Sequence, residues 1–447
     1  MYPGDANTPR ATYYADTNNV SPRLGIIIDP EGDARTSIRA AWGFFYDTIP
    51  GQGDFFQNGT LAPPFQPLQE IDFYANTTPP TSTYFSNPYN GVAVGAPGFP
   101  ANLTFIGWSL PHSFKTAQVQ QYNVSMQHQF TNSMGFELGY VGARGENLPI
   151  FMEVNPTTIL PTNSTTPGTN AYKAGVRTPF PAFGLTRPTF SAAKSWYDSL
   201  QASWQLRDYR HIQATAAYTW SHSQDHLSGL NIGTDSRSVL PVTIGDQASI
   251  DTALVREKGA SLFDARNRFI LSLQYELPRL EDRSLAKRLL IGGWKFNTIY
   301  QVQSGSPLTA ANSSTTAQSL TFRPNQTCNP NSGAQRKAGT VSNQHFFNAA
   351  CFALPTTGNL IDNSTSGNES RNTILGPGFN TMDASLFKIL NLRETKSFEF
   401  RFEVFNLFNE AHFAQPVATF GASTFGQITS TVGNDSRVIQ LAIKLAF

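Results

Sequence analysis

The chain has 447 residues, of which 14% are charged and 12% aromatic. Its 32 basic and 31 acidic side chains leave a net charge of +1, so it lacks the basic surplus that nucleic-acid binding requires. No run approaches the roughly 18 apolar residues that a membrane-spanning helix needs. Soluble domains carry about a quarter charged residues, more than this chain has. Because the chain has few charges and no long apolar run, its apolar side chains are expected to be spread over alternate positions of strands.

Alternation of apolar and polar residues predicts strands along most of the chain. The first clear pair has one apolar face made of Tyr122, Val124, Met126 and Phe130, then Phe136, Leu138 and Tyr140. The next pair repeats it with Leu200, Ala202, Trp204 and Leu206, then Ile212, Ala214, Ala216, Tyr218 and Trp220. Later strands continue with Phe269, Leu271, Leu273 and Tyr275, with Trp294, Phe296 and Tyr300, with Phe398, Phe400, Phe402 and Val404, and with Ile439, Leu441, Ile443, Leu445 and Phe447.

The predicted connections alternate between short and long. The short turns are expected near Pro30–Asp33, Thr131–Met134, Asp208–Arg210 and Arg393–Thr395, with a somewhat longer one at Arg279–Leu290. The long polar segments are expected near 48–111, 149–194, 227–261, 306–381 and 410–436. Polar faces rich in Gln, Asn, Ser and Thr, with this asymmetry of connections, are typical of an outer-membrane β-barrel with short periplasmic turns and long extracellular loops.

The sequence therefore predicts an all-β fold, an antiparallel transmembrane β-barrel of the outer-membrane type, with about eleven strands in one domain over residues 1–447. A secreted or cell-surface β-protein is the alternative, because a soluble sandwich alternates too. The start Met1–Asp5 has neither a basic nor an apolar segment of a signal peptide, although an outer-membrane protein must be exported.

Several strings resemble the Oar-like family of TonB-dependent receptors, common in acidobacteria. They are Ser21–Gly25, Ile38–Asp47, Gly139–Gly145, Tyr218–Ser223, Phe263–Phe269, Gly292–Trp294 leading to Gln303–Pro307, Gly376–Phe379, Phe400–Asn409 and Phe425–Ile428. This resemblance implies a barrel of about twenty-two strands closed around an N-terminal plug. It also implies energy from an inner-membrane TonB complex, received through an N-terminal TonB box.

About eleven strands are half of such a barrel, so we expect the chain to be the C-terminal half of a larger one, with the plug absent and the N-terminus truncated. An open half-barrel would expose two unpaired edges in lipid. The TonB complex would then be contacted only through an N-terminal region outside this chain.

Three residues are candidates for special roles. Phe447, a terminal aromatic on an alternating strand, is the expected signal for the outer-membrane barrel assembly machinery, the alternative being an ordinary last strand. Cys328 and Cys351, the only cysteines, lie in one long segment. In an exported protein such a pair suggests a disulfide that closes the loop, whereas two free thiols are the alternative.

Other groups are interpreted as structural. His222, Asp225 and His226 are read as the polar end of a strand, because positions 222 and 226 lie roughly 13 Å apart on a strand and zinc ligands lie about 2 Å from the metal. The aromatic residues near predicted strand ends are read as an interfacial girdle: Trp42, Tyr46, Trp220, Tyr300 and Phe405. We find no catalytic motif and expect no enzyme, no metal and no cofactor.

The sequence thus favours an outer-membrane receptor that takes up a solute actively, with outer-membrane lipid around it. An iron chelate, an oligosaccharide and a peptide all stay open as the solute. Surface adhesion through the long loops and passive diffusion through a porin are the alternatives.

Overall fold

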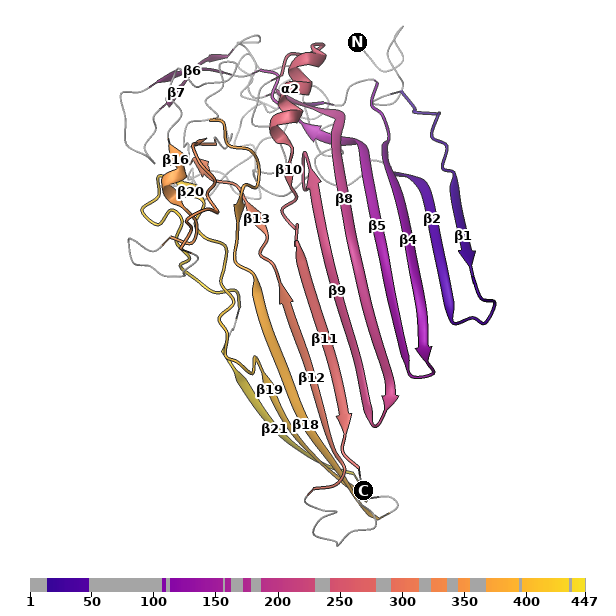
Figure 1. The fold of residues 1–447 in the computed structure, drawn as a ribbon. Helices are drawn as coiled ribbons and strands as arrows, with labels where there is room; N and C mark the ends of the chain where they lie inside the picture. The colour runs from indigo at the N-terminus through magenta and orange to yellow at the C-terminus, as the bar shows by residue number, and fades with distance from the viewer. Residues whose placement is uncertain are drawn as a thin grey trace, which may run out of the picture.

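The computed structural model describes residues 14–47, 107–109, 113–155, 157–161, 172–177, 186–229, 242–278, 291–312, 323–335, 345–353, 367–393, 396–433 and 436–446. They form one large sheet with short turns at one end and long connections at the other (Figure 1). We call these the short-turn end and the long-connection end. The expected turn at Arg279–Leu290 and most of the segment 48–111 lie outside the described residues, as does Phe447.

The main sheet has thirteen strands, and eleven of them form its continuous path. In order they are β1 (Arg23–Ile28), β2 (Thr36–Asp47), β4 (Ala117–Thr131), β5 (Met134–Phe151), β8 (Thr186–Tyr209), β9 (Ile212–Asp225), β11 (Asn267–Glu276), β12 (Trp294–Gln303), β18 (Phe379–Arg393), β19 (Lys396–Phe405) and β21 (Val438–Ala446). Every neighbouring pair along the path is antiparallel. The short strands β3 (Gly107–Ser109) and β10 (Gly259–Ala260) pair with β8 and β9.

The register confirms that the predicted apolar positions share one face. Val124 lies opposite Tyr140, Tyr140 opposite Leu200, and Leu200 opposite Trp220. These four side chains are 41–54% exposed. A soluble sandwich would bury such a row under a second sheet, but no described element covers it. The antiparallel all-β fold and the division into two faces are therefore confirmed, and the described residues leave the apolar face exposed.

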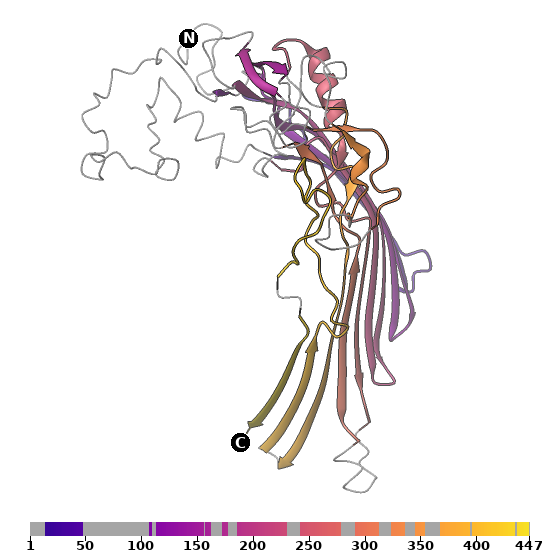
Figure 2. The ribbon, with the colours of Figure 1, turned by 90° about the vertical axis from the view of Figure 1, so that its left-hand side faces the viewer.

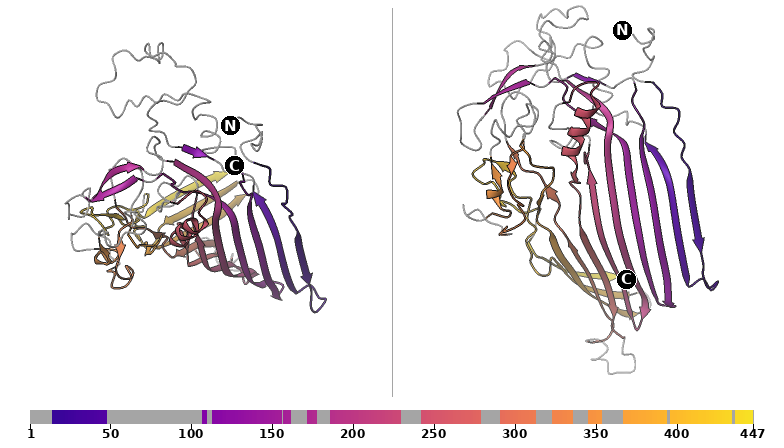
Figure 3. Two further views of the ribbon diagram at one scale, coloured as in Figure 1. Left: turned by 90° about the horizontal axis from the view of Figure 1, so that it is seen from above. Right: turned by 45° about the horizontal axis from the view of Figure 1, so that its top comes forward.

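The sheet is curved, as the side view shows (Figure 2) and as the view from above repeats (Figure 3). Its path is open within the described residues, because β1 and β21 each pair on one side only. Apolar side chains stand exposed on both of these strands, including Leu24 at 70% and Leu441 at 67%.

The expected loop at 149–194 is wrong at both ends. Strand β5 continues to Phe151, and β8 begins at Thr186. Between Gly145 and Pro149 the β5–β8 register shifts twice. Such bulges break the period of two, so the alternation that predicts strands disappears while the pairing goes on. Between the two strands, β6 (Thr157–Pro161) and β7 (Tyr172–Arg177) form a separate hairpin.

The segment expected as a loop at 227–261 contains a helix, α2 (Gln247–Glu257). The Asp246 side chain caps it by accepting a hydrogen bond from the Ala248 backbone N–H at 3.0 Å. Among the described residues, no helix is long and apolar enough to cross a membrane.

At the long-connection end, residues of the expected loops 306–381 and 410–436 pack together as a folded unit that we call the cap (Figure 1). Three short pairs connect it: β13 (Pro307–Leu308) with β17 (Ile374–Leu375), β14 (Ala311–Asn312) with β20 (Thr419–Phe420), and β15 (Asn325–Gln326) with β16 (Phe352–Ala353). Its buried core consists of Leu308, Ala310, Phe347, Cys351, Phe352, Ile374, Phe420 and Phe425.

The face assignment can be tested at two adjacent positions of β11. Leu273 lies opposite Ala214 and Thr298 on the apolar face, whereas Gln274 points to the other face. An Arg on the lipid side of a barrel costs about 2–4 kcal/mol at the midplane. We therefore expect Leu273→Arg to lower the yield of folded protein in lipid vesicles, and Gln274→Arg to leave it nearly unchanged.

Lipid contact itself is measured by labelling each position with a fluorophore. Quenchers in the acyl chains should dim a label at residue 273 and spare one at residue 274. Equal quenching at the two positions would show that the register of β11, and with it the face assignment, is wrong.

Candidate functional site

The face opposite the apolar one is polar along the length of the sheet. One row across four strands consists of Ser37, Gln127, Glu137 and Ser203. Charged side chains on this face form local pairs, such as Lys295 with Glu276 at 2.5 Å and Arg401 with Glu399 at 2.5 Å. A surface of hydrogen-bonding groups beside an apolar outer face is what a water-filled lumen requires.

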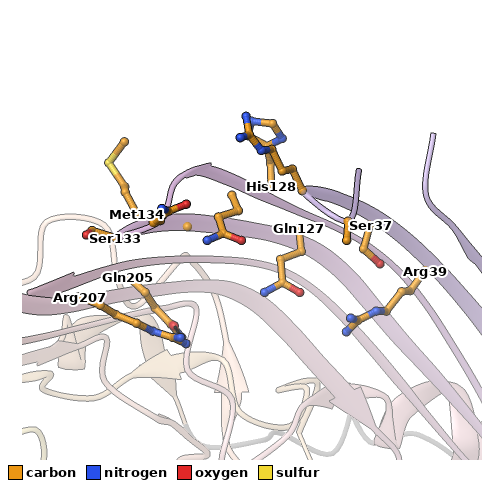
Figure 4. Close-up of a pocket in the computed structure, with 13 residues that line it drawn as sticks. Ser37, Arg39, Gln127, His128, Ser133, Met134, Gln205 and Arg207 are labelled. Carbon is orange, nitrogen blue, oxygen red and sulfur yellow. Dashed lines mark hydrogen bonds between the residues drawn. The ribbon is translucent and has the colours of Figure 1, made fainter. Parts of the chain in front are cut away.

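A cavity of about 210 Å³ opens on this face near the short-turn end, over strands β2, β4, β5 and β8 (Figure 4). Its lining consists of Ala34, Arg35, Ser37, Arg39, Gln127, His128, Gln129, Asn132, Ser133, Met134, Gly135, Gln205 and Arg207. The side chains of Arg39, Gln127, Gln205 and Arg207 lie on one side of the sheet, and those of His128 and Met134 lie on the other (Figure 4). The cavity is therefore a feature of the polar face.

Tight turns fix the strand ends around this cavity. The Asp29 carboxylate accepts hydrogen bonds from the backbone N–H groups of Gly32 and Ala34, which closes the β1–β2 turn. The backbone N–H of Arg207 donates to the Ser133 carbonyl at 2.7 Å, which joins the neighbouring turns. The period of two then places the side chains of Arg39 and Arg207 on the same face.

The cavity is cationic. Three arginines line it, and its lining contains neither Asp nor Glu. Arg35 lies 3.7 Å from Asp33, and Arg207 donates a hydrogen bond to Gln205 at 3.1 Å. Arg39 has no ion pair or hydrogen bond from its side chain to any described residue. The sequence did not indicate this cavity, because each arginine is one polar residue of a turn or an alternating strand.

The two cysteines lie in the cap. Cys328 and Cys351 are joined by a disulfide with a Cα–Cα distance of 4.9 Å. Cys351 is fully buried in the aromatic core, at the end of the short 3-10 helix Ala349–Cys351. The bond therefore closes a loop of the cap and lies outside the main sheet.

The residues at the end of β9 do more than terminate a polar strand. Asp225 is buried and forms an ion pair with Arg371 at 2.9 Å. Arg371 also donates to the backbone carbonyls of Asp225 and Glu257, both at 3.0 Å. Glu257, the last residue of α2, forms a second buried ion pair with Arg323. Together these pairs fasten the cap to the end of β9 and to α2, which the sequence did not indicate because Asp225 and Arg371 are 146 residues apart.

The two histidines have separate structural environments. His226 accepts a hydrogen bond from the Lys194 backbone N–H at 3.2 Å, and burial lowers its pKa to about 4. His222 lies 3.1 Å from Arg266 and 3.4 Å from Asp264. In the part of the chain that the structure describes, no three His, Cys, Asp or Glu side chains are grouped to hold a metal ion.

The expected aromatic girdle needs correction. Trp42, Trp220 and Tyr300 lie three to five residues inside the ends of β2, β9 and β12. Phe405 ends β19, but Val404 belongs to the apolar row, so the period of two turns Phe405 to the polar face.

The chain belongs to the outer membrane beta barrel domain family, whose model matches residues 1–440. It is thus an outer-membrane protein, and the long-connection end is the one such barrels place outside the cell. No curated protein sequence matches the chain.

Solved structures resemble the chain at low identity. The outer membrane transporter YddB from Escherichia coli is 12% identical with a TM-score of 0.48, over 96% of this chain and 41% of that one. The ferric preacinetobactin receptor BauA from Acinetobacter baumannii is 11% identical with a TM-score of 0.40, over 96% and 36%. The FrpB iron transporter (F3-3 variant) from Neisseria meningitidis is 10% identical with a TM-score of 0.40, over 95% and 39%. The chain spans about two fifths of the length of these proteins.

The cap contains a buried carboxyl group that makes its stability depend on pH. Glu369 is fully buried; its Oε1 accepts from the Ala310 backbone N–H at 2.9 Å, while its Oε2 has no described partner. Burial raises the pKa of Glu369 to about 8. The folded cap therefore holds a proton that the unfolded chain releases near pH 4.3, so its stability falls as the pH rises from there to about 8.

We expect hydrogen-exchange protection of the cap amides, corrected for the intrinsic exchange rate, to decrease between pH 6 and 8. Glu369→Gln should flatten this dependence, because a neutral amide keeps the bond to Ala310. Glu410→Gln, at an exposed loop position, is the matched control and should behave like the parent. An unchanged pH dependence in Glu369→Gln would assign the effect to another group.

The disulfide yields a further prediction. Closing a loop with a sequence separation of 23 residues should stabilise the cap by about 3 kcal/mol through the entropy of its unfolded state. The double variant Cys328→Ser/Cys351→Ser should therefore lose protection in the cap and keep the β-rich circular dichroism of the sheet. In exported, non-reduced protein both thiols should resist alkylation; two reactive thiols would show that the bond does not form.

Proposed function

We propose that this sheet forms about half of the barrel wall of a TonB-dependent receptor that takes up a solute across the outer membrane. The observation that carries the proposal is an open, curved antiparallel sheet with an exposed apolar face, a polar opposite face and two edge strands that each pair on one side only within the described residues. In lipid every backbone N–H and C=O needs a partner, so both edges must be covered by further strands.

The direction of the edge strands supports a larger barrel. Ten antiparallel pairings separate β1 from β21, so the two strands run the same way. Pairing β1 directly with β21 would create a parallel contact, whereas bacterial barrels are antiparallel throughout with an even number of strands. An odd number of additional strands is needed, and about eleven would give the roughly twenty-two-stranded class with a plugged lumen.

A plugged lumen requires energised uptake. In this proposal the solute, an iron chelate, an oligosaccharide or a peptide, first binds the cap and loops outside the cell and then passes the polar face. The TonB complex acts through the plug and TonB box that such receptors carry ahead of the barrel. The barrel assembly machinery recognises the last strand with Phe447, and outer-membrane lipid surrounds the apolar face.

The second candidate is a surface-interaction role, which the folded cap favours. Its aromatic core and its two ion pairs, one to β9 and one to α2, present a shaped surface outside the cell. Such a protein would bind a partner without transport.

Uptake in the presence and absence of energy separates the candidates. The parent gene is expressed in a Gram-negative host, and labelled ferric chelates, oligosaccharides and peptides are offered with and without a protonophore and in a strain lacking the TonB complex. We expect cell-surface binding in every case and uptake only in energised cells with TonB. Uptake without TonB would identify a porin, and binding to cells or proteins without any uptake would identify an adhesin.

A further inference from the structure

We infer that Lys194, Lys258 and Arg266 form a binding surface for the anionic phosphate headgroup of an outer-leaflet lipid, at the extracellular border of the apolar face. We call these three residues the basic rim. The inference rests on the proposed function in taking the apolar face as the one that lipid covers. It adds the chemical class of the lipid and the residues that contact its headgroup.

Two members of the basic rim lie on either side of Trp196. Trp196 lies four residues beyond Leu200 of the apolar row on β8, and Lys194 lies two residues further on. Because successive side chains of a strand alternate, all three belong to the apolar face. The ammonium of Lys258, which follows α2, lies 4.3 Å from the centre of the Trp196 ring. Beyond the apolar row, this face therefore continues with an aromatic ring between two lysines.

Arg266 extends the basic rim to the neighbouring strand. Its guanidinium lies 3.1 Å from the ring of His222, which is two residues beyond Trp220 of the apolar row on β9. His222 is opposite Asp198 in the register, so Arg266 stands at the level where charged side chains first appear on this face. Its side chain is 44% exposed.

The protein balances the charge of the basic rim only in part. Lys194 lies 3.8 Å from Glu146, and both side chains are about half exposed. Such an exposed pair is weak, so Lys194 is free to exchange its partner for a phosphate. Arg266 lies 2.8 Å from the buried Asp264. Lys258 is exposed and forms no ion pair with a described residue. Three cations thus face two carboxylates, and the surface carries a net positive charge.

The rest of the proposed receptor does not reach this surface. The basic rim belongs to β8, to the segment between α2 and β10, and to the residues before β11, in the middle of the path from β1 to β21 (Figure 1). Further barrel strands pair at β1 and β21, and a plug fills the lumen on the other side of the sheet. The neighbour of the basic rim is therefore the membrane.

The side chains present are those that lipid headgroups bind. Tryptophan rings lie at the level of the headgroups, and lysine stems cover apolar surface while the ammonium reaches the polar layer. Lysine binds phosphate as a compact point charge, and clustered cations beside the bilayer attract anionic lipids. Lys258 above Trp196 combines these features: the ring contacts the upper acyl chain, and the two lysines contact the phosphate.

The test uses the full chain purified in a maltoside detergent, and native mass spectrometry measures the lipids bound to each molecule. Phosphatidylglycerol, whose headgroup is anionic, is compared with phosphatidylcholine of the same acyl chains. The parent should bind phosphatidylglycerol roughly ten-fold more tightly. Lys194→Gln and Lys258→Gln should each reduce this preference roughly five-fold, whereas Lys258→Arg keeps the charge and should retain it. Circular dichroism confirms that each variant is folded.

Arg268→Gln is the matched control. Arg268 stands at the same end of the sheet as Arg266, but the period of two places it on the polar face of β11, opposite Thr219 and Gln303. Its removal should leave the preference for phosphatidylglycerol unchanged. An excess of inorganic phosphate should not displace the lipid, because the acyl chains contribute to its binding. Displacement would show a site for free phosphate and overturn the assignment to lipid.

Equal binding of the two lipids by the parent overturns the inference. So does an equal loss of preference in Arg268→Gln, since the effect would then come from the net charge of the chain. The proposed function has its own readouts, lipid quenching at residues 273 and 274 and TonB-dependent uptake. If these give the expected results while the two lipids bind equally, only the basic rim is wrong.

Discussion

The absence of water in the bilayer determines most of this structure. An unpaired backbone N–H or C=O in hydrocarbon costs several kcal/mol, so the chain crosses as long strands whose neighbours satisfy each other. Each of the ten neighbouring pairs on the path from β1 to β21 is antiparallel, and every second pair is joined at the short-turn end. The same constraint makes the two edges the least stable part of the sheet, because there the pairing stops while the apolar side chains continue.

Charged residues mark where the apolar face ends. Near the periplasmic end, Lys388 lies on the apolar side, but its ammonium donates to the Gly292 carbonyl at 2.7 Å and lies 5.0 Å from the centre of the Trp294 ring. A lysine stem covers apolar surface while its charge reaches polar groups, as is common at membrane interfaces. Near the other end of that face, Arg144 and Asp198 form an ion pair at 2.9 Å. The apolar band lies between these two levels.

Local chemistry made the strands predictable, and long-range contacts made the sites unpredictable. The period of two assigned Leu271, Leu273 and their neighbours to one face correctly, because successive side chains of a strand point to opposite faces. The bulges after Gly145 concealed the continuation of β5 and β8, since they break that period. Helix α2 shows little apolar periodicity and sits among residues typical of loops. Asp225 and Arg371 carry no local signal, because they are 146 residues apart. The cavity carries none either, because its lining comes from four different strands.

The two ends of the sheet use arginine in opposite ways. At the cap, Arg323 is buried against Glu257 and Arg371 against Asp225. Removing one partner of such a pair leaves the other charge buried without a partner, at a cost of about 3–5 kcal/mol. Those arginines are structural, and they couple the fold of the cap to the end of β9. At the short-turn end the arginines are exposed and have only local partners: Arg35 lies 3.7 Å from Asp33, and Arg207 donates a hydrogen bond to Gln205. Arginine therefore joins distant segments where it is buried at the cap, and it contributes to the polar face where it stands on an alternating strand.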